Sequence, residues 1–537
     1  MPRQTIAIIS VFALSAAVCF GVTWHVPGEV ATIQAALDST RDGDTVLVEV
    51  GTYNEALQAP AHTFALLGVI SEPDSEMAVI DPTPLEGSNH LACLTLRSLS
   101  RAVIRDFVFR NGRGMWPREH YDDVGGIANT AADLRIEHCL FDSTYTGVGC
   151  ALSCQRPVTI SDCQFILNSQ GCVWDRSPAR TSLINCDFSW HGEKALWLAD
   201  SALVENCRFH DQQGPGEWIW LEGYGITVRG CTFGPTTNSV NDIIWTSNLR
   251  AFTFEQNTVQ DADVWFAIVE FHGGIGNDTT YFRNNVFRRT HAVVAAAGGA
   301  GISIITGENM TVPVIFVTDN IFDSCQAPSP DGFGSIHMGP VNVRLSRNLF
   351  TGPSTPGPAV RKWQVDTLVV ANSYVHNCSF NHTGTALKAD RWYFNVVSNW
   401  WSDSSGPYYA GNHPEGQGDT IIGRWVDFDP WLTEDPLIES APTPDSPVPS
   451  NMRLVIYPNP FNATATFFMT VDRPAEYEVE LYNLLGQCVE RLWSGTIVKE
   501  QRITMRAGDL GSGIYFARLR QSATNKTTAL AKLVLLK

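Results

Sequence analysis

The sequence has 537 residues, a formal net charge of −18, and 44% hydrophobic against 17% charged residues. This length exceeds what one compact core accommodates, so the chain divides into domains or forms a solenoid. The excess of apolar over charged residues excludes a largely disordered chain. The negative charge argues against a nucleic-acid partner, because phosphate binding needs clustered Lys and Arg. It also disfavours unassisted binding of a polyanionic sugar, although a structural or bridging calcium ion could reverse this locally.

The N-terminus has the pattern of an export signal. Arg3 supplies the positive end, residues 5–20 form an apolar run, and small residues lie near the end of that run. We therefore assign residues 1–21 to a signal peptide. The run is short for a membrane span, and no later stretch is apolar enough to cross a bilayer, so no span is expected after signal removal. A signal anchor or lipidation at Cys19 is the alternative, although Val18 stands where lipidation requires a small residue.

A helical cap is expected at the start of the mature chain. Residues 30–53 contain a short amphipathic helix, a turn and a strand. Thr32 suits the N-cap, with Ile33, Ala36 and Leu37 on one face of the helix. A helix here would cover the exposed end of the first coil, as the terminal repeats of solenoids require.

One short pattern recurs along the following 300 or so residues. It reads aliphatic, any, aliphatic, any, a turn-tolerant residue, Cys or Asn, any, then Phe, as in LRIEHCLF, VTISDCQF and VRLSRNLF. Most copies are 21 to 28 residues apart, which is typical of a solenoid, and the alternation within each copy predicts strands. The aligned Cys, Asn or equivalent positions are Phe107, Cys139, Cys163, Cys186, Cys207, Cys231, Asn257, Asn285, Asn320, Asn348, Ser373 and Asn399.

Stacking of parallel strands explains the residues that recur. Equivalent residues of successive coils lie about 4.8 Å apart, so like side chains form columns. The residue before each Cys or Asn suits a left-handed backbone, which a tight bend between two strands requires. The cysteines are expected to be buried free thiols, because stacked side chains point in parallel and oppose the disulfide torsion; one or two bridges stay open. No metal site is expected, since zinc favours closely paired cysteines.

These repeats, the opening at residues 51–55 (GTYNE) and the closing segment at residues 398–432 resemble the pectate-lyase-like superfamily of right-handed parallel β-helix proteins. The resemblance covers residues 22–432 through shared repeats. We expect the aromatic closing segment to plug the last coil, because the ends of solenoids must be capped; ligand binding there is the alternative. The superfamily includes lyases, hydrolases and esterases. Only the opening matches the pectinesterases, however, and Asp122-Asp123 supplies just an acidic pair of the polygalacturonase set. The fold resemblance therefore carries no activity with it.

The C-terminal part is organised differently. Residues 433–451 form an extended linker that is rich in Pro, Ser and acidic residues. Residues 452–537 contain short alternating strands with turn signals about every 8–12 residues, which predicts a small immunoglobulin-like β-sandwich. The expected fold class is therefore all-β, with a right-handed parallel β-helix solenoid followed by this sandwich.

Four motifs occur in order in the C-terminal module: YPNPFN at 457–462, LYNLLG at 481–486, LGSGIYF at 510–516 and the ending KLVLLK at 532–537. Together they resemble the type A C-terminal sorting domain of type IX (Por) secretion over the whole module. This resemblance implies export by the type IX secretion machinery, to the medium or to the outer cell surface of a Gram-negative-type bacterium. An immunoglobulin-like domain without a sorting role is the alternative.

A second strand of each coil carries tryptophan at one aligned place in four successive copies. The residues are Trp174, Trp197, Trp220 and Trp245, at spacings of 23, 23 and 25 residues. On an outer face, the indoles would form a platform for the apolar faces of sugar rings. Alternatively they point inward or pack beneath long loops, which the usual burial of large aromatic residues favours.

Carboxylates lie near this series, and Glu193 and Glu217 are the candidates for a glycosidase acid/base pair. The other acidic residues nearby are Asp175, Glu222, Asp242 and Glu270. We expect a secreted or cell-surface β-helix that binds a polysaccharide or another surface without catalysis, because no known catalytic motif is complete. The alternative is a polysaccharide lyase or glycoside hydrolase with a site on the β-helix face. A purely structural spacer would show neither binding nor product release.

Overall fold

We describe the protein from a computed structural model of the full chain, which forms two compact units, Met1–Ala441 and Pro442–Lys537. The division falls within the linker predicted at residues 433–451, and the expected signal peptide up to residue 20 lies outside the described residues. The described residues are 21–71, 76–83, 85, 91–96, 101–113, 124–129, 133–144, 150–154, 156–168, 171–175, 181–212, 214–236, 238–274, 278–293, 299–306, 314–326, 334–339, 342–352, 357–362, 373–381, 383–389, 393–437, 453–457, 464–471, 474–483, 487–498, 500–506, 508, 510–521 and 526–535.

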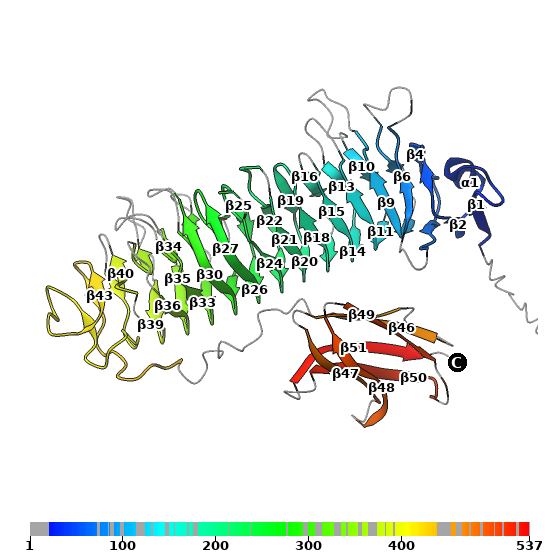
Figure 1. Cartoon of the computed structure of the whole chain (residues 1–537). Helices are drawn as coiled ribbons and strands as arrows, with labels where there is room; N and C mark the ends of the chain where they lie inside the picture. The colour runs from blue at the N-terminus through cyan, green and yellow to red at the C-terminus, as the bar shows by residue number, and fades with distance from the viewer. Residues whose placement is uncertain are drawn as a thin grey trace, which may run out of the picture. The chain divides into compact units, whose positions relative to one another are not determined.

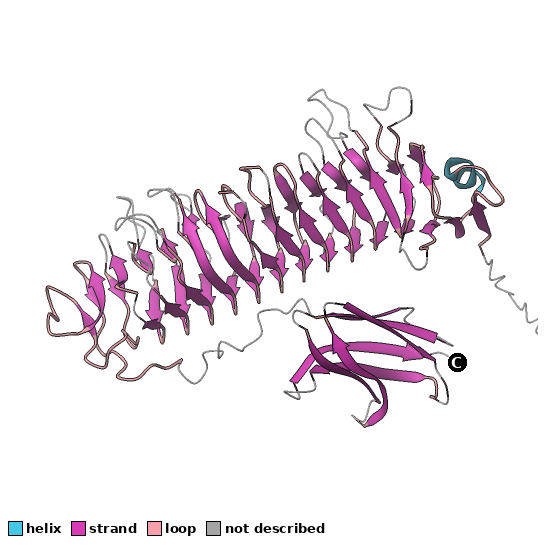
Figure 2. Ribbon diagram, in the orientation of Figure 1, coloured by secondary structure: helices cyan, strands magenta, loops and turns pink. Residues whose placement is uncertain are grey.

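The larger unit is a parallel β-helix in which most coils contribute one strand to each of three sheets (Figure 1). A strand pairs in parallel with the strand three places later in the chain, so residues about one repeat apart are neighbours. We name the sheets A, B and C in the order in which the chain visits them. As predicted, the described part of the unit is almost entirely β, with a short helix at one end (Figure 2).

The strands follow here in their spatial order. Sheet A contains β1 (Thr23–Val26), β2 (Asp44–Val48), β5 (Phe64–Gly68), β8 (Arg101–Arg105), β11 (Asp133–Glu137), β14 (Val158–Ser161), β17 (Ser182–Ile184), β20 (Leu203–Glu205), β23 (Thr227–Arg229), β26 (Thr253–Glu255), β29 (Thr280–Arg283), β32 (Val314–Thr318), β35 (Asn342–Ser346), β38 (Tyr374–His376), β41 (Phe394–Asn395) and β44 (Val426–Asp427). Sheet B contains β3 (Thr52–Tyr53), β6 (Ala78–Ile80), β9 (Phe107–Arg110), β12 (Leu140–Asp142), β15 (Gln164–Ile166), β18 (Asp187–Ser189), β21 (Arg208–His210), β24 (Thr232–Phe233), β27 (Thr258–Val264), β30 (Val286–Ala292), β33 (Ile321–Asp323), β36 (Leu349–Thr351) and β39 (Ser379–Asn381). Sheet C contains β4 (Leu57–Gln58), β7 (Leu94–Leu96), β10 (Val124–Asn129), β13 (Cys150–Cys154), β16 (Gly171–Asp175), β19 (Lys194–Ala199), β22 (Ile219–Tyr224), β25 (Ile244–Arg250), β28 (Val269–Gly273), β31 (Ile302–Thr306), β34 (Ile336–Met338), β37 (Val360–Lys362), β40 (Thr385–Ala389), β43 (Gly418–Ile422) and β42 (Pro407–Tyr408).

A single residue with a left-handed backbone joins sheet A to sheet B in most coils, as the repeat predicts. His138, Asp162 and Asn185 have φ of 51°, 55° and 56°, and each precedes an inward-facing cysteine. The bend costs little here because Asn, Asp and Gly tolerate this conformation better than other residues. The sharp turn therefore fixes the register of the repeats that contain it.

The inward Cys and Asn side chains that follow this bend form a column that we call the ladder. Along the solenoid, the ladder changes from thiols to amides. The cysteines whose side chains the structure describes are free, and all of them except Cys488 are buried. In the second half, the Asn257 amide donates to Asn285 Oδ1 at 3.1 Å, and Asn285 donates to Asn320 Oδ1 at 2.9 Å. Asn320 in turn donates to Asn348 Oδ1 at 3.0 Å. Each buried amide thus satisfies its neighbour in the next coil.

One predicted ladder position is wrong. Ser373 precedes β38, and the inward position after that strand is occupied by Cys378, which follows Asn377 with φ of 54°. Asn348 Nδ2 lies 3.7 Å from Cys378 Sγ, and Cys378 N donates to Asn399 Oδ1 at 2.8 Å. The tight turn therefore lies five residues later than the sequence alignment placed it.

The phenylalanine that ends each repeat forms an aromatic column inside the solenoid. Phe141, Phe165 and Phe188 stack with ring centroids 4.7 and 4.8 Å apart. At the far end Trp401 takes the place of phenylalanine, 4.9 Å from Phe380 and fully buried. The closing segment thus ends the column with its bulkiest aromatic side chain, as expected of a plug.

The N-terminal cap is the predicted helix, α1 (Ile33–Ser39), whose residues Ile33, Ala36 and Leu37 are buried. Thr32 accepts a hydrogen bond from Ala35 N, and the Glu55 carboxylate accepts from Ile33 N at 2.9 Å and from Gln34 N at 2.8 Å. The opening GTYNE segment therefore anchors the start of the cap. Among the described residues, no helix is long and apolar enough to cross a membrane.

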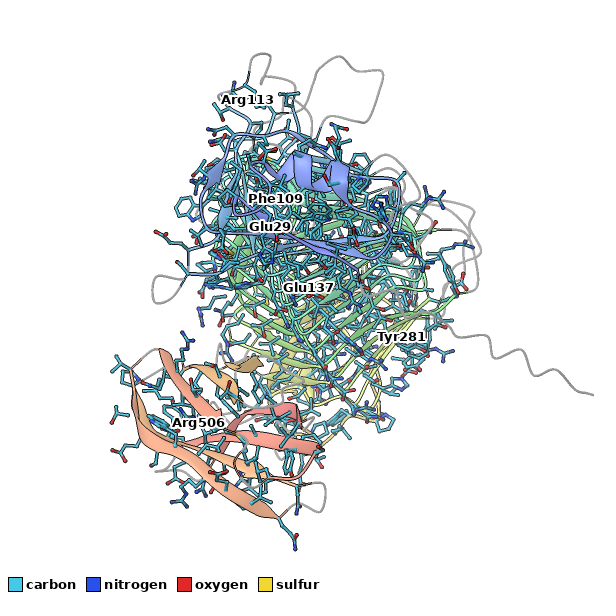
Figure 3. The ribbon with its side chains drawn as sticks, turned by 90° about the vertical axis from the view of Figure 1, so that its right-hand side faces the viewer. Glu29, Phe109, Arg113, Glu137, Tyr281 and Arg506 are labelled. Carbon is cyan, nitrogen blue, oxygen red and sulfur yellow. The ribbon has the colours of Figure 1, made fainter. Side chains whose placement is uncertain are left out.

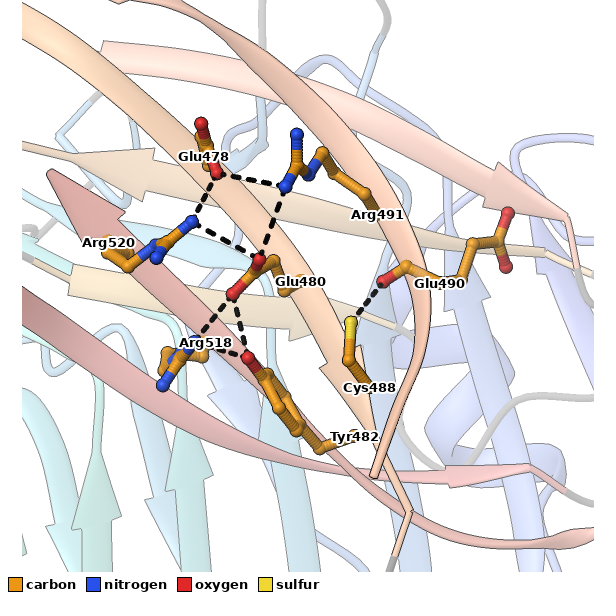
Figure 4. Close-up of polar contacts among 8 residues, drawn as sticks. All are labelled: Glu478, Glu480, Tyr482, Cys488, Glu490, Arg491, Arg518 and Arg520. Atoms are coloured by element: carbon orange, nitrogen blue, oxygen red, sulfur yellow. Dashed lines mark hydrogen bonds and ion pairs between the residues drawn. The ribbon is translucent and has the colours of Figure 1, made fainter. Parts of the chain in front are cut away.

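The smaller unit consists of two antiparallel sheets around a separate core. On β47, Tyr477, Val479 and Leu481 are buried, while the alternating Glu478 and Glu480 join an ionic network on the other face of the sheet (Figure 4). The network is completed by Arg491 of β48 and by Arg518 and Arg520 of β50. The strands are β45 (Arg453–Tyr457), β46 (Thr464–Thr470) and β49 (Glu500–Arg506) in one sheet, and β48 (Cys488–Ile497), β47 (Ala475–Tyr482), β50 (Gly513–Gln521) and β51 (Lys526–Leu535) in the other.

Candidate glycan-binding face

The four predicted tryptophans form one column on the outer face of sheet C. They lie on the successive strands β16, β19, β22 and β25, which Figure 1 labels. The parallel register pairs Trp174 with Trp197, Trp197 with Trp220, and Trp220 with Trp245. Strands alternate their side chains between two faces, and the residues next to these tryptophans are buried in the core. The half-buried indoles therefore point outward, and the interpretation that they point into the solenoid is wrong.

The indoles are in contact with each other along the solenoid axis. Ring centroids lie 5.3 Å apart for Trp174–Trp197 and Trp197–Trp220, and 4.2 Å apart for Trp220–Trp245. The planes are inclined by 66° and 58° in the two end pairs, so the rings of those pairs do not fully cover each other's faces, whereas Trp197 and Trp220 stack at 30°. The column spans about 14 Å at about 4.8 Å per coil. It continues into the imidazole of His272, 5.4 Å from Trp245.

We call the column of Trp174, Trp197, Trp220 and Trp245 the tryptophan face. Polar side chains line one of its edges. Lys194 Nζ lies 3.2 Å from Glu217 Oε2 and 5.0 Å from the centroid of Trp220. Trp197 Nε1 donates to Glu222 Oε1 at 3.3 Å. These contacts hold two of the indoles in place and set charged groups beside them.

A pair of carboxyl groups from successive coils lies close to Glu217. Asp242 is only 2% exposed, and its Oδ1 accepts a hydrogen bond from Ala267 N at 2.8 Å. Burial, together with the neighbouring charge of Glu270, raises the pKa of Asp242 well above its ordinary value. Glu270 also contacts His272 Nε2 at 2.7 Å. Asp242 can therefore keep its proton at pH values where isolated carboxyl groups have lost theirs.

The two predicted catalytic candidates, Glu217 and Glu193, lie in different surroundings. Glu217 lies in the cluster with Lys194, and its Oε1 is 3.5 Å from Asn241 Nδ2. Glu193 is exposed on the turn before β19, where its backbone carbonyl accepts a hydrogen bond from Gln212 Nε2. The carboxyl pair of Asp242 and Glu270 is better placed than Glu193. The sequence signal for Asp242 is that it follows Glu217 by 25 residues, the same spacing as between Trp220 and Trp245.

No group of three or more His, Cys, Asp or Glu side chains is arranged to hold a metal ion in the described part of the chain. Asp122-Asp123, the acidic pair noted in the sequence, lies outside the described residues. The expectation of a structural or bridging calcium ion is left without a candidate site here.

Two family models match the chain, one to each of its parts. A right handed beta helix region matches residues 176–350, and a secretion system C-terminal sorting domain matches residues 455–535. The chain joins a right-handed β-helix to a sorting domain. The sorting domain indicates that the protein is secreted or held at the outer cell surface, and it implies the type IX secretion machinery as a partner. No curated protein matches the chain significantly.

Several solved structures are similar to the chain at low identity. An alginate lyase from Paenibacillus is 10% identical, with 75% of this chain and 99% of that chain covered and a TM-score of 0.29. The A-module of a mannuronan C-5 epimerase from Azotobacter vinelandii is 11% identical, with 73% and 94% covered and a TM-score of 0.34. A tailspike capsular polysaccharide depolymerase from an Acinetobacter baumannii bacteriophage is 11% identical, with 96% and 78% covered and a TM-score of 0.29. At these TM-scores the likenesses carry no argument about function.

Proposed function

We propose that this exported β-helix binds a glycan on its tryptophan face. The observation that carries the proposal is the outward, in-register column of four half-buried indoles on sheet C. Sugar rings pack their apolar faces on aromatic side chains, and the column is long enough for several consecutive sugars. Lys194, Glu217 and Glu222 at its edge can bond to sugar hydroxyl groups.

Binding to a glycan panel, followed by titration calorimetry on the best ligand, tests the proposal. Replacing Trp197 and Trp220 together with alanine removes the middle of the column, and we expect affinity to fall about 10- to 50-fold. The matched control is Trp425→Ala, because Trp425 is 57% exposed and directly precedes β44 of sheet A in the closing coil. Far-UV circular dichroism checks that all variants fold. Equal affinity of the double variant and the control would refute the proposal.

A second candidate function, glycoside hydrolysis, is favoured by the carboxyl pair of Asp242 and Glu270. A glycosidase needs one protonated carboxyl group and one carboxylate beside the scissile bond. In such a reaction, Asp242 would give its proton to the glycosidic oxygen as the bond to the anomeric carbon breaks. A water molecule would then supply hydroxide to that carbon, and its proton would return to a carboxylate such as Glu217.

Release of reducing ends from the bound glycan separates the two functions. We expect Asp242→Asn and Glu217→Gln to abolish release if hydrolysis occurs, whereas Glu193→Gln leaves it unchanged. An unsaturated product would instead indicate a lyase. Binding without any product by the wild-type protein excludes this second candidate and leaves the binding proposal intact.

A further inference from the structure

A second aromatic stripe lies on the outer face of sheet A, separate from the tryptophan face. The register pairs Tyr281 of β29 with Phe316 of β32, Phe316 with Arg344 of β35, and Arg344 with Tyr374 of β38. Their inward neighbours, among them Phe282, are buried in the core, so these four side chains point outward. Figure 3 shows Tyr281 on the outer side of the solenoid, whereas Phe109 lies inside.

The side chains of this stripe form one continuous stack. Tyr281 and Phe316 have centroids 5.5 Å apart and planes within 15°. The Arg344 guanidinium lies 5.4 Å from the Phe316 centroid and 5.7 Å from the Tyr374 centroid, so it sits between two aromatic rings. At the other end, the guanidinium of Arg283 lies 5.2 Å from the centroid of Tyr281.

This stacking positions the Arg344 guanidinium but does not use its N–H groups. Among the described residues, no carboxylate lies within 4.0 Å of it, although the side chain is exposed. The neighbouring arginines are paired: Arg283 with Glu255 at 2.7 Å, and Arg347 with Asp319 at 2.6 Å. A guanidinium that is stacked on both faces has lost part of its freedom already, and its edge remains available for a planar, two-pronged partner.

The rest of the stripe favours an oxygen-rich, negatively charged ligand. Rings stacked along the axis turn their edges outward, and the edge of an aromatic ring carries partial positive charge. The outward residues that follow on the same strands are Thr318 and Ser346, whose hydroxyl groups can bond to sugar hydroxyls. The chain as a whole carries a charge of −18, so a polyanion would be repelled. An isolated carboxylate on an otherwise neutral chain fits these conditions.

We propose that the stripe of Tyr281, Phe316, Arg344 and Tyr374 binds a glycan that carries a uronic acid among neutral sugars. Arg344 pairs with the sugar carboxylate through two parallel N–H···O bonds. Tyr281 and Tyr374 contact the sugars on either side of it. The stripe is on sheet A, so it does not depend on the tryptophan face of sheet C.

Titration calorimetry with glucuronoxylan oligosaccharides tests this site, because they carry isolated uronic acids on a neutral chain. A matched ligand is the same oligosaccharide with its carboxyl group reduced to an alcohol. We expect the reduced ligand to bind the wild-type protein roughly 10- to 100-fold more weakly, as does the intact ligand with Arg344→Gln. Arg344→Lys should recover only part of the affinity, because lysine cannot form the two-pronged bond.

The control variant is Arg135→Gln, which removes an outward arginine in the same column of sheet A, remote from the stripe. It should bind as the wild-type protein does, and so should the double tryptophan variant of sheet C. Absence of binding, equal binding of the reduced oligosaccharide, or no effect of Arg344→Gln would overturn the proposal. Binding of poly-L-glutamate or dextran sulfate as tight as that of the oligosaccharide would also overturn it, because the site would then recognise charge alone.

Discussion

The amide ladder makes a quantitative prediction about the stability of the second half of the solenoid. In the Asn320→Ala variant, Asn285 loses the partner of its backbone N–H, at 3.0 Å, and of one amide hydrogen, at 2.9 Å. The Phe282 carbonyl also loses the Asn320 amide donor at 2.9 Å. Asn348 Oδ1 also loses the Asn320 amide donor at 3.0 Å, but it still accepts from the backbone N of residue 320 at 3.1 Å. The other three buried polar groups are left unsatisfied, each costing about 1–3 kcal/mol. Allowing for water entering the space, we expect the free energy of unfolding to fall by about 3–6 kcal/mol.

The assay is urea unfolding of the full chain, followed by far-UV circular dichroism and tryptophan fluorescence. The matched variant is Asn320→Cys, because cysteine occupies the same ladder position in earlier coils; there Cys163 Sγ accepts from Cys139 N at 3.4 Å and donates to Ile136 O at 3.8 Å. We expect this variant to lose about half as much as Asn320→Ala, since sulfur forms weaker hydrogen bonds. A loss below about 1 kcal/mol for Asn320→Ala would refute the reasoning, because it would mean that the ladder bonds do not stabilise the coil stack.

Three further predictions concern buried groups. The pKa of Asp242 is raised in the folded chain, so the free energy of unfolding falls as the pH rises above 3.8, the ordinary pKa of an Asp side chain. Asp242→Asn should flatten this decline in urea unfolding between about pH 4 and pH 8. An unchanged dependence of the free energy of unfolding on pH would contradict the prediction. Phe188→Ala should cost about 3–5 kcal/mol by the same method, because Phe188 is fully buried in the aromatic column, whereas the exposed Trp425→Ala should cost less than about 0.5 kcal/mol. Burial raises the pKa of Cys378 to about 12, so peptide mapping after alkylation of the native protein should find Cys378 unmodified and Cys488 modified; modification of Cys378 would show that the ladder opens.

Much of the fold could be predicted from the sequence because the solenoid repeats its chemistry. Most coils have a bend that needs a left-handed residue, followed by an inward Cys or Asn and a core Phe, so the same sequence pattern recurs in them. The coils around β2 and β5 lack this sequence pattern, because their strands end at Val48 and Gly68 without a ladder Cys or Asn after them. Their place in the solenoid was accordingly not visible from the repeat.

The orientation of the tryptophans could not be decided from spacing. β22 begins within the segment WIWL (218–221), in which Trp218 is fully buried and Trp220 is half-buried on the outer face. Both residues are indoles two positions apart, so periodicity alone does not say which belongs to the core. The fold decides it: the strand begins after Trp218, where the chain still turns into sheet C.

The stripe on sheet A leaves a regular spacing in the sequence, but the wrong ladder position at Ser373 hides part of it. Tyr281, Phe316 and Arg344 each stand four residues before the ladder positions Asn285, Asn320 and Asn348. Tyr374 stands four residues before Cys378, so it joins the series only when the ladder is corrected from Ser373 to Cys378. Reading the outward positions of correctly aligned copies would have revealed the stripe.

Glycan binding on the tryptophan face is tested most directly by hydroxyl-radical footprinting with and without the best ligand of the glycan panel. Oxidation is read by mass spectrometry at each indole of the face and, as an internal reference, at the exposed Trp425. We expect the ligand to protect Trp197 and Trp220 several-fold while oxidation of Trp425 stays unchanged. Equal oxidation of all three indoles in the presence of a bound glycan would contradict binding at this face.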